Sequence, residues 1–176
     1  MTDTITDQKK YIKGWTGGLP ETPCGFGSKI RQTAKQREWI PQIIKLHGII
    51  TVADIGAGDL NWINQMTLPL GTEYSAYDLV PRQPSVKQFN VLEDDCPKAD
   101  LLMVLWVINH FPVDMMKIAI DNVLSSGSKY LLMTYDSRLP DFMDLPFIDE
   151  IKLRAAAGKD HPNPHNGLFM RLHKLC

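Results

Sequence analysis

The sequence contains no long apolar run, no excess of charge of either sign and few cysteines. Lys and Arg total 19 against 20 Asp and Glu, so no overall field steers the chain toward nucleic acid. No stretch approaches the ~18 apolar residues of a membrane span, and the polar N-terminus has no apolar signal region. The three cysteines lack the paired spacing of a zinc site or a disulfide framework. These absences predict a cytoplasmic protein with no membrane partner.

A single continuous apolar pattern organises the chain. With 176 residues, of which 44% are hydrophobic, the chain fits one domain with a proper core. The first 27 residues are polar and rich in glycine, with prolines at Pro20 and Pro23, which predicts an N-terminal arm or lid over residues 1–27 ahead of one domain over residues 28–176. Basic clusters near Lys9 and Lys29 are typical of a solvated face, and they leave nucleic-acid contact open without supporting it.

Strand and helix signals alternate from Ser28 onward. Strands without polar alternation indicate a sheet that is covered on both faces. The alternation predicts a doubly wound, mostly parallel α/β sheet of Rossmann-like type with helices on both faces. Helices are predicted over 29–39, 41–47 (after a break at Pro41), 61–66, 114–124 and 147–157, and strands over 49–55, 74–77, 86–91, 101–106, 130–134 and 168–172.

A strand, a pair of glycines and a distant acid together have the pattern of a nucleotide site. The apolar run that ends in Ile55 leads into Gly56 and Gly58, and Asp78 ends the next strand twenty residues later. Such glycines let backbone amides approach a ligand, and an acid at the neighbouring strand tip can bind ribose hydroxyls. The alternative is that the glycines only permit a tight turn and that Asp54 caps the next helix.

The turn differs from a dinucleotide-binding turn in two ways. It lacks the third glycine of that fingerprint, and Asp59 stands where pyrophosphate oxygens would pack. An acid at this position repels phosphate and tolerates a cationic ligand. The pattern therefore favours an adenosyl sulfonium over NAD, and an oxidoreductase is the third choice.

The sequence resembles the class I S-adenosylmethionine-dependent methyltransferases, with Val52–Gly58 as the first motif and Asp78 as the ribose-binding acid. The resemblance covers about residues 24–135 and implies S-adenosylmethionine as cofactor. Three further segments are similar to a poorly characterised bacterial and phage subgroup of this class: Gly25–Ser28 with Thr33, Gly58–Trp62 and Ser126–Leu132.

The resemblance also implies which residues hold the cofactor. Gly56 and Gly58 would pass close to its methionine part, and residues 90–94 would border the adenine. Thr33 would help to close the site from the N-terminal side, although with Gln36 it also fits a helix capping box. The expected cofactor-binding set is Gly27, Ser28, Thr33, Asp54, Gly56, Ala57, Gly58, Asp59, Trp62, Asp78, Leu79 and Trp106.

The acceptor side departs from the subgroup pattern. Residues 106–110 replace the Arg-Asp pair that precedes a histidine in the subgroup. His110 can act as a general base, or it is a hydrogen-bonded histidine that begins a helix. Tyr135 and Asp136 leave the fifth strand at the edge that faces the pocket, and we expect them to contact an acceptor. Trp106 forms either a wall of the cofactor pocket or part of the core.

Two function hypotheses follow. The first is an enzyme that transfers a methyl group to an oxygen or nitrogen of a small molecule or a nucleic acid. The second is a module that binds S-adenosylmethionine, has a degenerate acceptor site and serves a protein or nucleic-acid partner. No metal is expected, because the prolines between His161 and His165 forbid a shared helix face and no carboxylates complete a ligand set.

Overall fold

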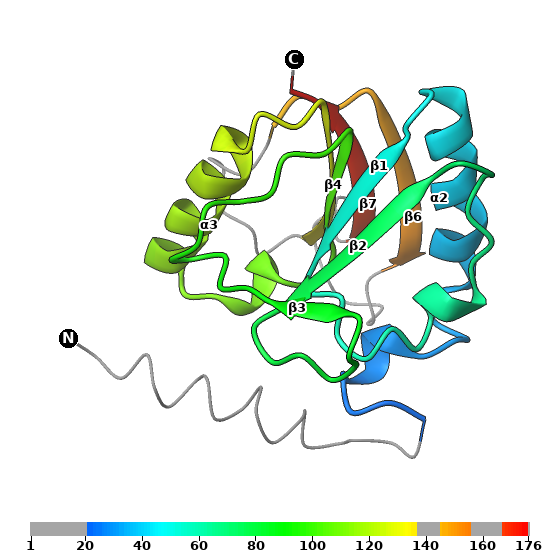
Figure 1. Ribbon diagram of the computed structural model, residues 1–176, viewed down its shortest axis with the longest axis horizontal. Helices are drawn as coiled ribbons and strands as arrows, with labels where there is room; N and C mark the ends of the chain where they lie inside the picture. The colour runs from blue at the N-terminus through cyan, green and yellow to red at the C-terminus, as the bar shows by residue number, and fades with distance from the viewer. Residues whose placement is uncertain (1–20, 137–144, 156–166, 176) are drawn as a thin grey trace.

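One mixed sheet carries the fold of the computed structural model, which describes residues 21–136, 145–155 and 167–175 (Figure 1). Its seven strands among these residues have the order β3-β2-β1-β4-β5-β7-β6. Neighbouring strands from β3 to β5 are parallel, whereas β7 is antiparallel to both β5 and β6. The predicted mostly parallel α/β sheet is therefore confirmed. The strands are β1 (Thr51–Ile55), β2 (Glu73–Asp78), β3 (Val86–Gln88), β4 (Leu101–Val104), β5 (Tyr130–Asp136), β6 (Asp149–Ala155) and β7 (Gly167–Lys174).

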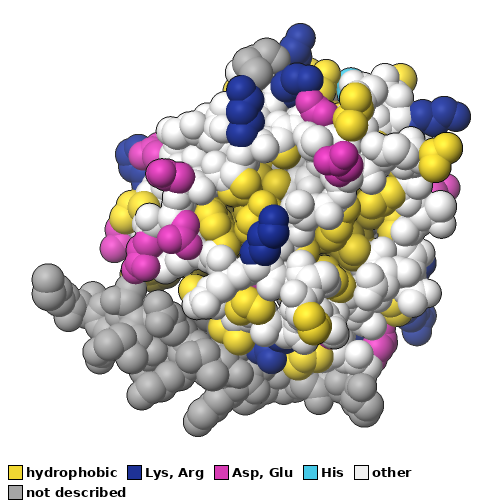
Figure 2. Space-filling view, in the orientation of Figure 1, with side chains coloured by type: hydrophobic (Ala, Val, Ile, Leu, Met, Phe, Trp, Pro, Cys, Tyr) yellow, Lys and Arg dark blue, Asp and Glu magenta, His cyan; other side chains and the backbone are white. Residues whose placement is uncertain are grey.

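Helices cover both faces of the sheet, with α2 (Ala34–Leu46) and α3 (Val113–Ser125) on opposite sides (Figure 1). Side chains alternate along each strand, so Leu101 and Met103 pack with α2 while Leu102 and Val104 pack with α3. Within the described part of the chain, no helix is both long and apolar enough to cross a membrane. On the face shown in Figure 2, acidic and basic side chains are interspersed, in keeping with the balanced composition.

Helix α2 runs through Pro41 without a break, so the predicted division into two helices is wrong. Pro41 cannot donate an intrahelical hydrogen bond, which normally ends or kinks a helix. Its neighbours Ile40, Ile43 and Ile44 are, however, at most 1% exposed and lie in the core cluster beneath the helix. Burial of this apolar stripe against the sheet outweighs the missing hydrogen bond. At Pro41, tertiary packing therefore outweighs the local helix-breaking propensity of proline.

The predicted helix over 147–157 is also wrong, because its residues 149–155 form strand β6. Ile151 and Leu153 pack against the same core cluster, and Ile151 pairs with Met170 of β7. Two apolar positions separated by one polar residue have strand periodicity, which the neighbouring alanines obscured. The predicted helix over 61–66 is likewise reduced to one 3-10 turn, η2 (Ile63–Gln65).

The amino-terminal edge of the sheet is held together by Asp100. Its Oδ2 accepts hydrogen bonds from the N–H groups of Ile50 and Thr51, both at 3.0 Å. Its Oδ1 lies 2.6 Å from Lys129 Nζ. The hydrogen bond from Lys129, followed by that from the Thr51 amide, lowers the pKa of Asp100 to about 2. One carboxylate therefore ties the start of β1 to the starts of β4 and β5.

We expect Asp100→Ala to lower the free energy of unfolding by about 1–3 kcal/mol at pH 7, because two backbone donors and a lysine lose their acceptor. A depressed pKa stabilises the fold above the ordinary value of 3.8, and this contribution is lost as pH falls toward about 2. The difference between native and variant in urea unfolding should thus shrink between pH 4 and pH 2.

The matched control is Asp121→Asn, which removes an exposed pair with Lys117 one helical turn away. Such pairs contribute about 0.5 kcal/mol or less. Equal effects of the two substitutions at pH 7 would contradict the anchoring role of Asp100.

Candidate functional site

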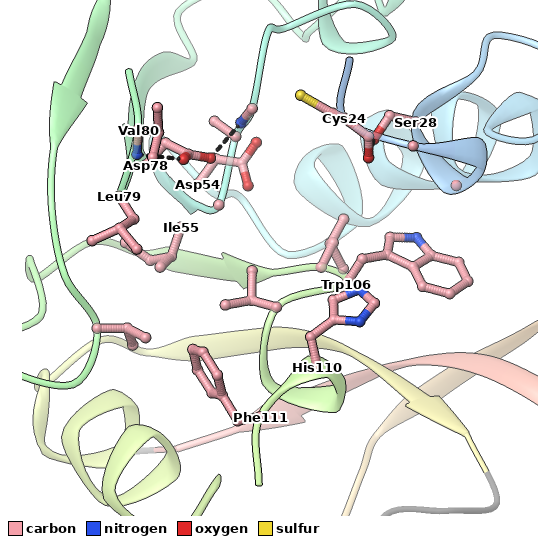
Figure 3. A pocket seen from close by; sticks show the side chains of 18 of the residues that line it. Cys24, Ser28, Asp54, Ile55, Asp78, Leu79, Val80, Trp106, His110 and Phe111 are labelled. Carbon is pink, nitrogen blue, oxygen red and sulfur yellow. Dashed lines mark hydrogen bonds between the residues drawn. The ribbon is translucent and has the colours of Figure 1, made fainter. Parts of the chain in front are cut away.

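A cavity of about 410 Å³ lies at the carboxyl edge of the parallel strands. The strand order arranges its lining from one end to the other: Asn90 follows β3, Asp78 ends β2, Gly56 follows β1, Trp106 follows β4 and Leu168 begins β7. Figure 3 shows Asp54 and Asp78 on one side of this space and Trp106 and His110 on another. The cavity straddles β1 and β4, where the strand order reverses and α/β sheets bind ligands. Its volume is in the range of small-molecule sites.

Hydrogen bonds attach the glycine turn after β1 to the end of β2. The N–H groups of Gly56 and Ala57 donate to the Tyr77 carbonyl oxygen at 2.8 and 3.0 Å. The Gly58 N–H donates to Asp78 Oδ2 at 2.8 Å, and Asp78 Oδ1 accepts from the Val80 N–H at 2.9 Å (Figure 3). The carboxylate is thus held in place by two amides. Because each oxygen has a further lone pair, it can still accept bonds from ligand hydroxyls.

Glycine is required at both ends of this turn. Gly56 has φ 80° and Gly58 has φ 63°, a region that other residues rarely adopt. A Cβ at Gly56 would lie 2.2 Å from Val107 Cγ2, and one at Gly58 would lie 2.8 Å from Cys24 Sγ. The segments that carry Val107 and Cys24 therefore approach the turn to a distance that only glycine allows.

Asp54 is an ionisable group in the buried wall of the cavity. It is 2% exposed, and its Oδ2 accepts a hydrogen bond from the Tyr74 hydroxyl at 2.6 Å. Burial raises the pKa of Asp54 to about 7; the Tyr74 hydrogen bond lowers it and the charge of Asp78 raises it. The carboxyl therefore titrates near neutrality. A cationic ligand group nearby would favour its ionised form.

The N-terminal segment, residues 21–33, closes one side of the cavity. Asn61 Nδ2 donates to the Ser28 carbonyl oxygen at 3.0 Å and to Glu21 Oε1 at 3.1 Å. Glu21 Oε1 also accepts from the Ile30 N–H at 2.6 Å. Burial, followed by the charge of Asp59, raises the pKa of Cys24 to about 11, so this thiol stays protonated against the glycine turn. Asn61, two residues before η2, thus positions the segment that carries Gly27 and Ser28.

Most of the predicted cofactor residues line this cavity. Thr33 and Asp59 do not: the Thr33 hydroxyl donates to the Lys29 carbonyl oxygen at 3.0 Å, and Asp59 Oδ1 accepts from the Asn61 N–H at 3.2 Å. Thr33 precedes α2 without a side-chain capping bond, so the capping-box alternative is wrong. The lining residues from the predicted set are Gly27, Ser28, Asp54, Gly56, Ala57, Gly58, Trp62, Asp78, Leu79 and Trp106.

The predicted acceptor residues separate in the structure. His110 ends the 3-10 turn η3 (Ile108–His110), lines the cavity and is exposed. Tyr135 lies outside the lining and is 5% exposed, with its ring 4.7 Å from the Arg171 guanidinium carbon. Asp136 ends β5 and pairs with Leu168, which does line the cavity. The histidines at 161 and 165 fall outside the residues that the structure describes. Among the described residues, no cluster of three or more potential metal ligands occurs.

The sequence analysis missed several lining residues, among them Arg82, Gln36, Leu153 and Leu168. Arg82 follows Asp78 by four residues, and a cation so close to a ribose-type acid was a usable signal. Gln36 interrupts the buried stripe of α2 at helical spacing from Ile40, which was a weaker one. Leu153 and Leu168 belong to the antiparallel strands. Their contribution follows from strand pairing that sequence periodicity does not reveal.

Comparisons with known proteins identify the fold. No family model and no curated protein matches the sequence. The methyltransferase domain of bacterial CtHen1-CN is 10% identical with TM-score 0.62, covering 81% of this chain and 99% of that one. The N-methyltransferase NodS from Bradyrhizobium japonicum WM9 is 11% identical with TM-score 0.62, covering 95% and 97%. Magnesium protoporphyrin IX methyltransferase from Synechocystis PCC 6803 is 13% identical with TM-score 0.57, covering 97% and 90%. The chain therefore has the class I methyltransferase fold.

We predict that Gly56→Ala severely destabilises the turn, because the new Cβ meets Val107 and the backbone has φ 80°. Gly71→Ala is the matched control, since Gly71 has φ 86° but nothing within 4 Å of an added Cβ. The control should cost only the backbone strain of about 1–2 kcal/mol. Urea unfolding of both variants measures the difference, and equal losses would exclude a packing role for Gly56.

A second prediction concerns the pH dependence of stability. The folded state holds the Asp54 proton more tightly than the unfolded chain, so this contribution is full below pH 3.8 and is lost as pH rises toward about 7. Asp54→Asn should remove that loss, which amounts to at most about 1.4 kcal/mol per pH unit. Tyr74→Phe should extend the loss to higher pH, because the hydrogen bond that favours the ionised carboxylate is gone.

Urea unfolding at pH 5 and pH 8 tests both substitutions. Parallel pH profiles for the native protein and Asp54→Asn would show that Asp54 does not titrate in this range.

Proposed function

We propose that the chain is an S-adenosylmethionine-dependent methyltransferase that acts on an oxygen or nitrogen acceptor. The observation that carries the proposal is the glycine turn bonded to Asp78, at the point where the strand order reverses in a methyltransferase fold. Two of the similar proteins were crystallised with S-adenosylmethionine or S-adenosylhomocysteine. A cationic cofactor is consistent with the carboxyl groups of Asp54 and Asp78 in the cavity wall.

The cavity residues fit the parts of such a cofactor. Asp78 would accept hydrogen bonds from ribose hydroxyls, and the Gly56–Gly58 turn with Asp54 would hold the methionine part. The apolar side chains of Leu79 and Phe111 and the polar Asn90 suit an adenine ring. Bound there, the cofactor supplies a sulfonium methyl group that is ready for displacement.

The protein's part in methyl transfer is mainly alignment. The hydrogen-bonded turn keeps the cofactor site in a fixed geometry. His110 lines the cavity and would accept the proton that an acceptor hydroxyl or amine releases. Asp136, at the end of β5 and paired with Leu168, would lie on the acceptor side of the cavity, whereas Tyr135 is buried outside the cavity lining. Trp106 would form the wall between the cofactor and the acceptor.

The proposal also covers the class of the methyl acceptor and the cellular compartment of the protein. The solved structures of similar fold include a small RNA methyltransferase and a magnesium protoporphyrin methyltransferase, so a nucleic acid and a small molecule both stay open as acceptors. The free thiols of Cys24 and Cys96 support a reducing, cytoplasmic setting. We also propose that residues 1–27 are an N-terminal arm or lid and that residues 28–176 form one domain.

We predict that the native protein binds S-adenosylhomocysteine and that Asp78→Asn weakens this binding by roughly 10- to 100-fold, the loss expected when hydrogen bonds to a charged acceptor are weakened. Glu73→Gln is the matched control, because Glu73 is an exposed acid at the opposite end of the same strand. Isothermal titration calorimetry provides the measurement. Failure of the native protein to bind, or equal affinities for all three proteins, would refute the cofactor assignment.

Turnover separates an enzyme from a degenerate binding module. Components of a cell extract incubated with methyl-labelled cofactor should become labelled when the native protein is added. They should stay unlabelled when the Asp54→Ala variant is added instead. Binding without any labelling would favour the module with a protein or nucleic-acid partner.

A further inference from the structure

Residues 21–30 form a loop that closes on itself at the cavity, and we call it the N-terminal loop. Glu21 Oε1 accepts a hydrogen bond from the Ile30 N–H at 2.6 Å, which joins the two ends of the loop. Within it, the Ser28 N–H donates to the Gly25 carbonyl oxygen at 3.2 Å. Compact surface loops whose ends meet are frequently functional. Because these internal bonds fix its shape, the loop can change position as one unit.

The N-terminal loop extends from the turn after β1 to the segment after β4. Its residues 23–28 all line the cavity, and Figure 3 shows Cys24 and Ser28 across that space from His110. At one end, Cys24 Sγ lies 2.8 Å from the position of a Cβ on Gly58. At the other end, a Cβ on Gly27 would lie 3.5 Å from the Trp106 ring. The loop thus covers the space between β1 and β4, and it has to move when a ligand passes through this side of the cavity.

The N-terminal loop contributes little to the apolar core. None of its residues 21–29 belongs to the two core clusters that the described residues form, and Phe26 is 53% exposed. Thr22 is buried, but its hydroxyl oxygen accepts a hydrogen bond within the loop, from the Cys24 N–H at 3.0 Å. Segments with few buried apolar contacts open at a lower free energy than the core does. The position of the loop therefore depends strongly on its polar contacts.

The side chain of Asn61 joins the loop to the rest of the domain. Its Nδ2 donates to the Ser28 carbonyl oxygen at 3.0 Å and to Glu21 Oε1 at 3.1 Å. The backbone of Asn61 is held in turn, because its N–H donates to Asp59 Oδ1 at 3.2 Å. The hydrogen bond from the Ile30 amide, followed by that from Asn61, lowers the pKa of Glu21, so the carboxylate is ionised at neutral pH. One amide group thus bonds to two separate points of the loop.

We propose that the N-terminal loop is a movable cover of the cofactor site and that Asn61 is the positioning residue that fastens it in the closed position. Loss of the two Asn61 bonds frees the loop, while its second end stays attached to α2. That attachment is made by the Ile30 carbonyl oxygen, which accepts from Arg37 Nη2 at 3.0 Å and from Thr33 Oγ1 at 3.2 Å. The inference rests on the proposed function, because it assigns the cover to cofactor exchange.

Reaction of the Cys24 thiol with N-ethylmaleimide measures opening of the loop without any cofactor. Cys24 is half-buried and its sulfur faces Gly58, so the reagent gains full access only when the loop moves. Peptide mass spectrometry distinguishes Cys24 from the other two cysteines. Asn61→Ala should raise the rate of labelling about tenfold, the effect of losing two hydrogen bonds. Asn64→Ala, at an exposed asparagine of η2, is the matched control and should leave the rate unchanged.

An exchange of groups between Asn61 and Glu21 tests their direct contact. Asn61→Asp places a second carboxylate beside Glu21, so it should raise the labelling rate at least as much as Asn61→Ala does. Adding Glu21→Gln restores a donor and an acceptor in the opposite direction, because the new amide can donate to the new carboxylate. The double variant should therefore label more slowly than Asn61→Asp alone. Labelling as fast as in Asn61→Asp would show that the pair does not fasten the loop.

Binding kinetics connect the loop to the cofactor. Surface plasmon resonance with immobilised protein gives the association and dissociation rate constants of S-adenosylhomocysteine. Because opening precedes both entry and release, Asn61→Ala should raise both constants about tenfold and change the affinity much less. A faster dissociation with an unchanged association rate would instead show a static wall, which overturns the movable cover.

The two sets of measurements separate the inference from the proposed function. Native-like Cys24 labelling in Asn61→Ala, or equal labelling in Asn61→Ala and Asn64→Ala, would refute the fastening role of Asn61. Failure of the native protein to bind S-adenosylhomocysteine would refute the proposed function and the role in cofactor exchange. The labelling rates would still decide whether Asn61 fastens the loop, since they are measured without the cofactor.

Discussion

The hydrogen bonds between the glycine turn after β1 and the end of β2 are the constraint on which the site depends. The Tyr77 carbonyl accepts from Gly56 and Ala57, and the Asp78 carboxylate accepts from Gly58. These bonds hold the turn beside β2 and leave space above it. Val107 and Cys24 then approach the two glycines so closely that any side chain there would collide. The floor of the cavity and the segments around it are thus fixed together.

The strand order converts this local constraint into an elongated cavity. Because the order reverses between β1 and β4, the segments that leave these strands diverge and leave room between them. The antiparallel strands β7 and β6 extend the edge on one side, and the N-terminal segment held by Asn61 covers it. The end of the cavity at β2 carries charged side chains, whereas the described residues that line its end beyond β4 include no Asp, Glu, Lys or Arg. This separation gives one cavity two chemically distinct ends.

The polar groups at the two edges of the sheet differ in how well their hydrogen bonds stabilise the fold. Asp54 is buried and accepts a hydrogen bond from the Tyr74 hydroxyl, and its burial raises its pKa. Trp106 keeps a strained φ, and its indole nitrogen has no partner among the described residues. In contrast, Asp100 at the opposite edge has three donors and a lowered pKa. The amino edge of the sheet is therefore built for stability and the carboxyl edge for ligands.

The sequence by itself determined the parallel sheet and the turn, since a β-branched run followed by Gly56 and Gly58 has few other local conformations. It also indicated Asp78 as the site acid, because Asp78 ends the strand that follows β1 in the chain, and successive parallel strands end at the same edge of a sheet. Tertiary structure alone decided the continuity of α2 through Pro41 and the conversion of residues 149–155 to a strand, where packing outweighed propensity. It alone brought Gln36, Leu153 and Leu168 to one cavity. Contacts between such distant residues depend on strand order, which no local pattern encodes.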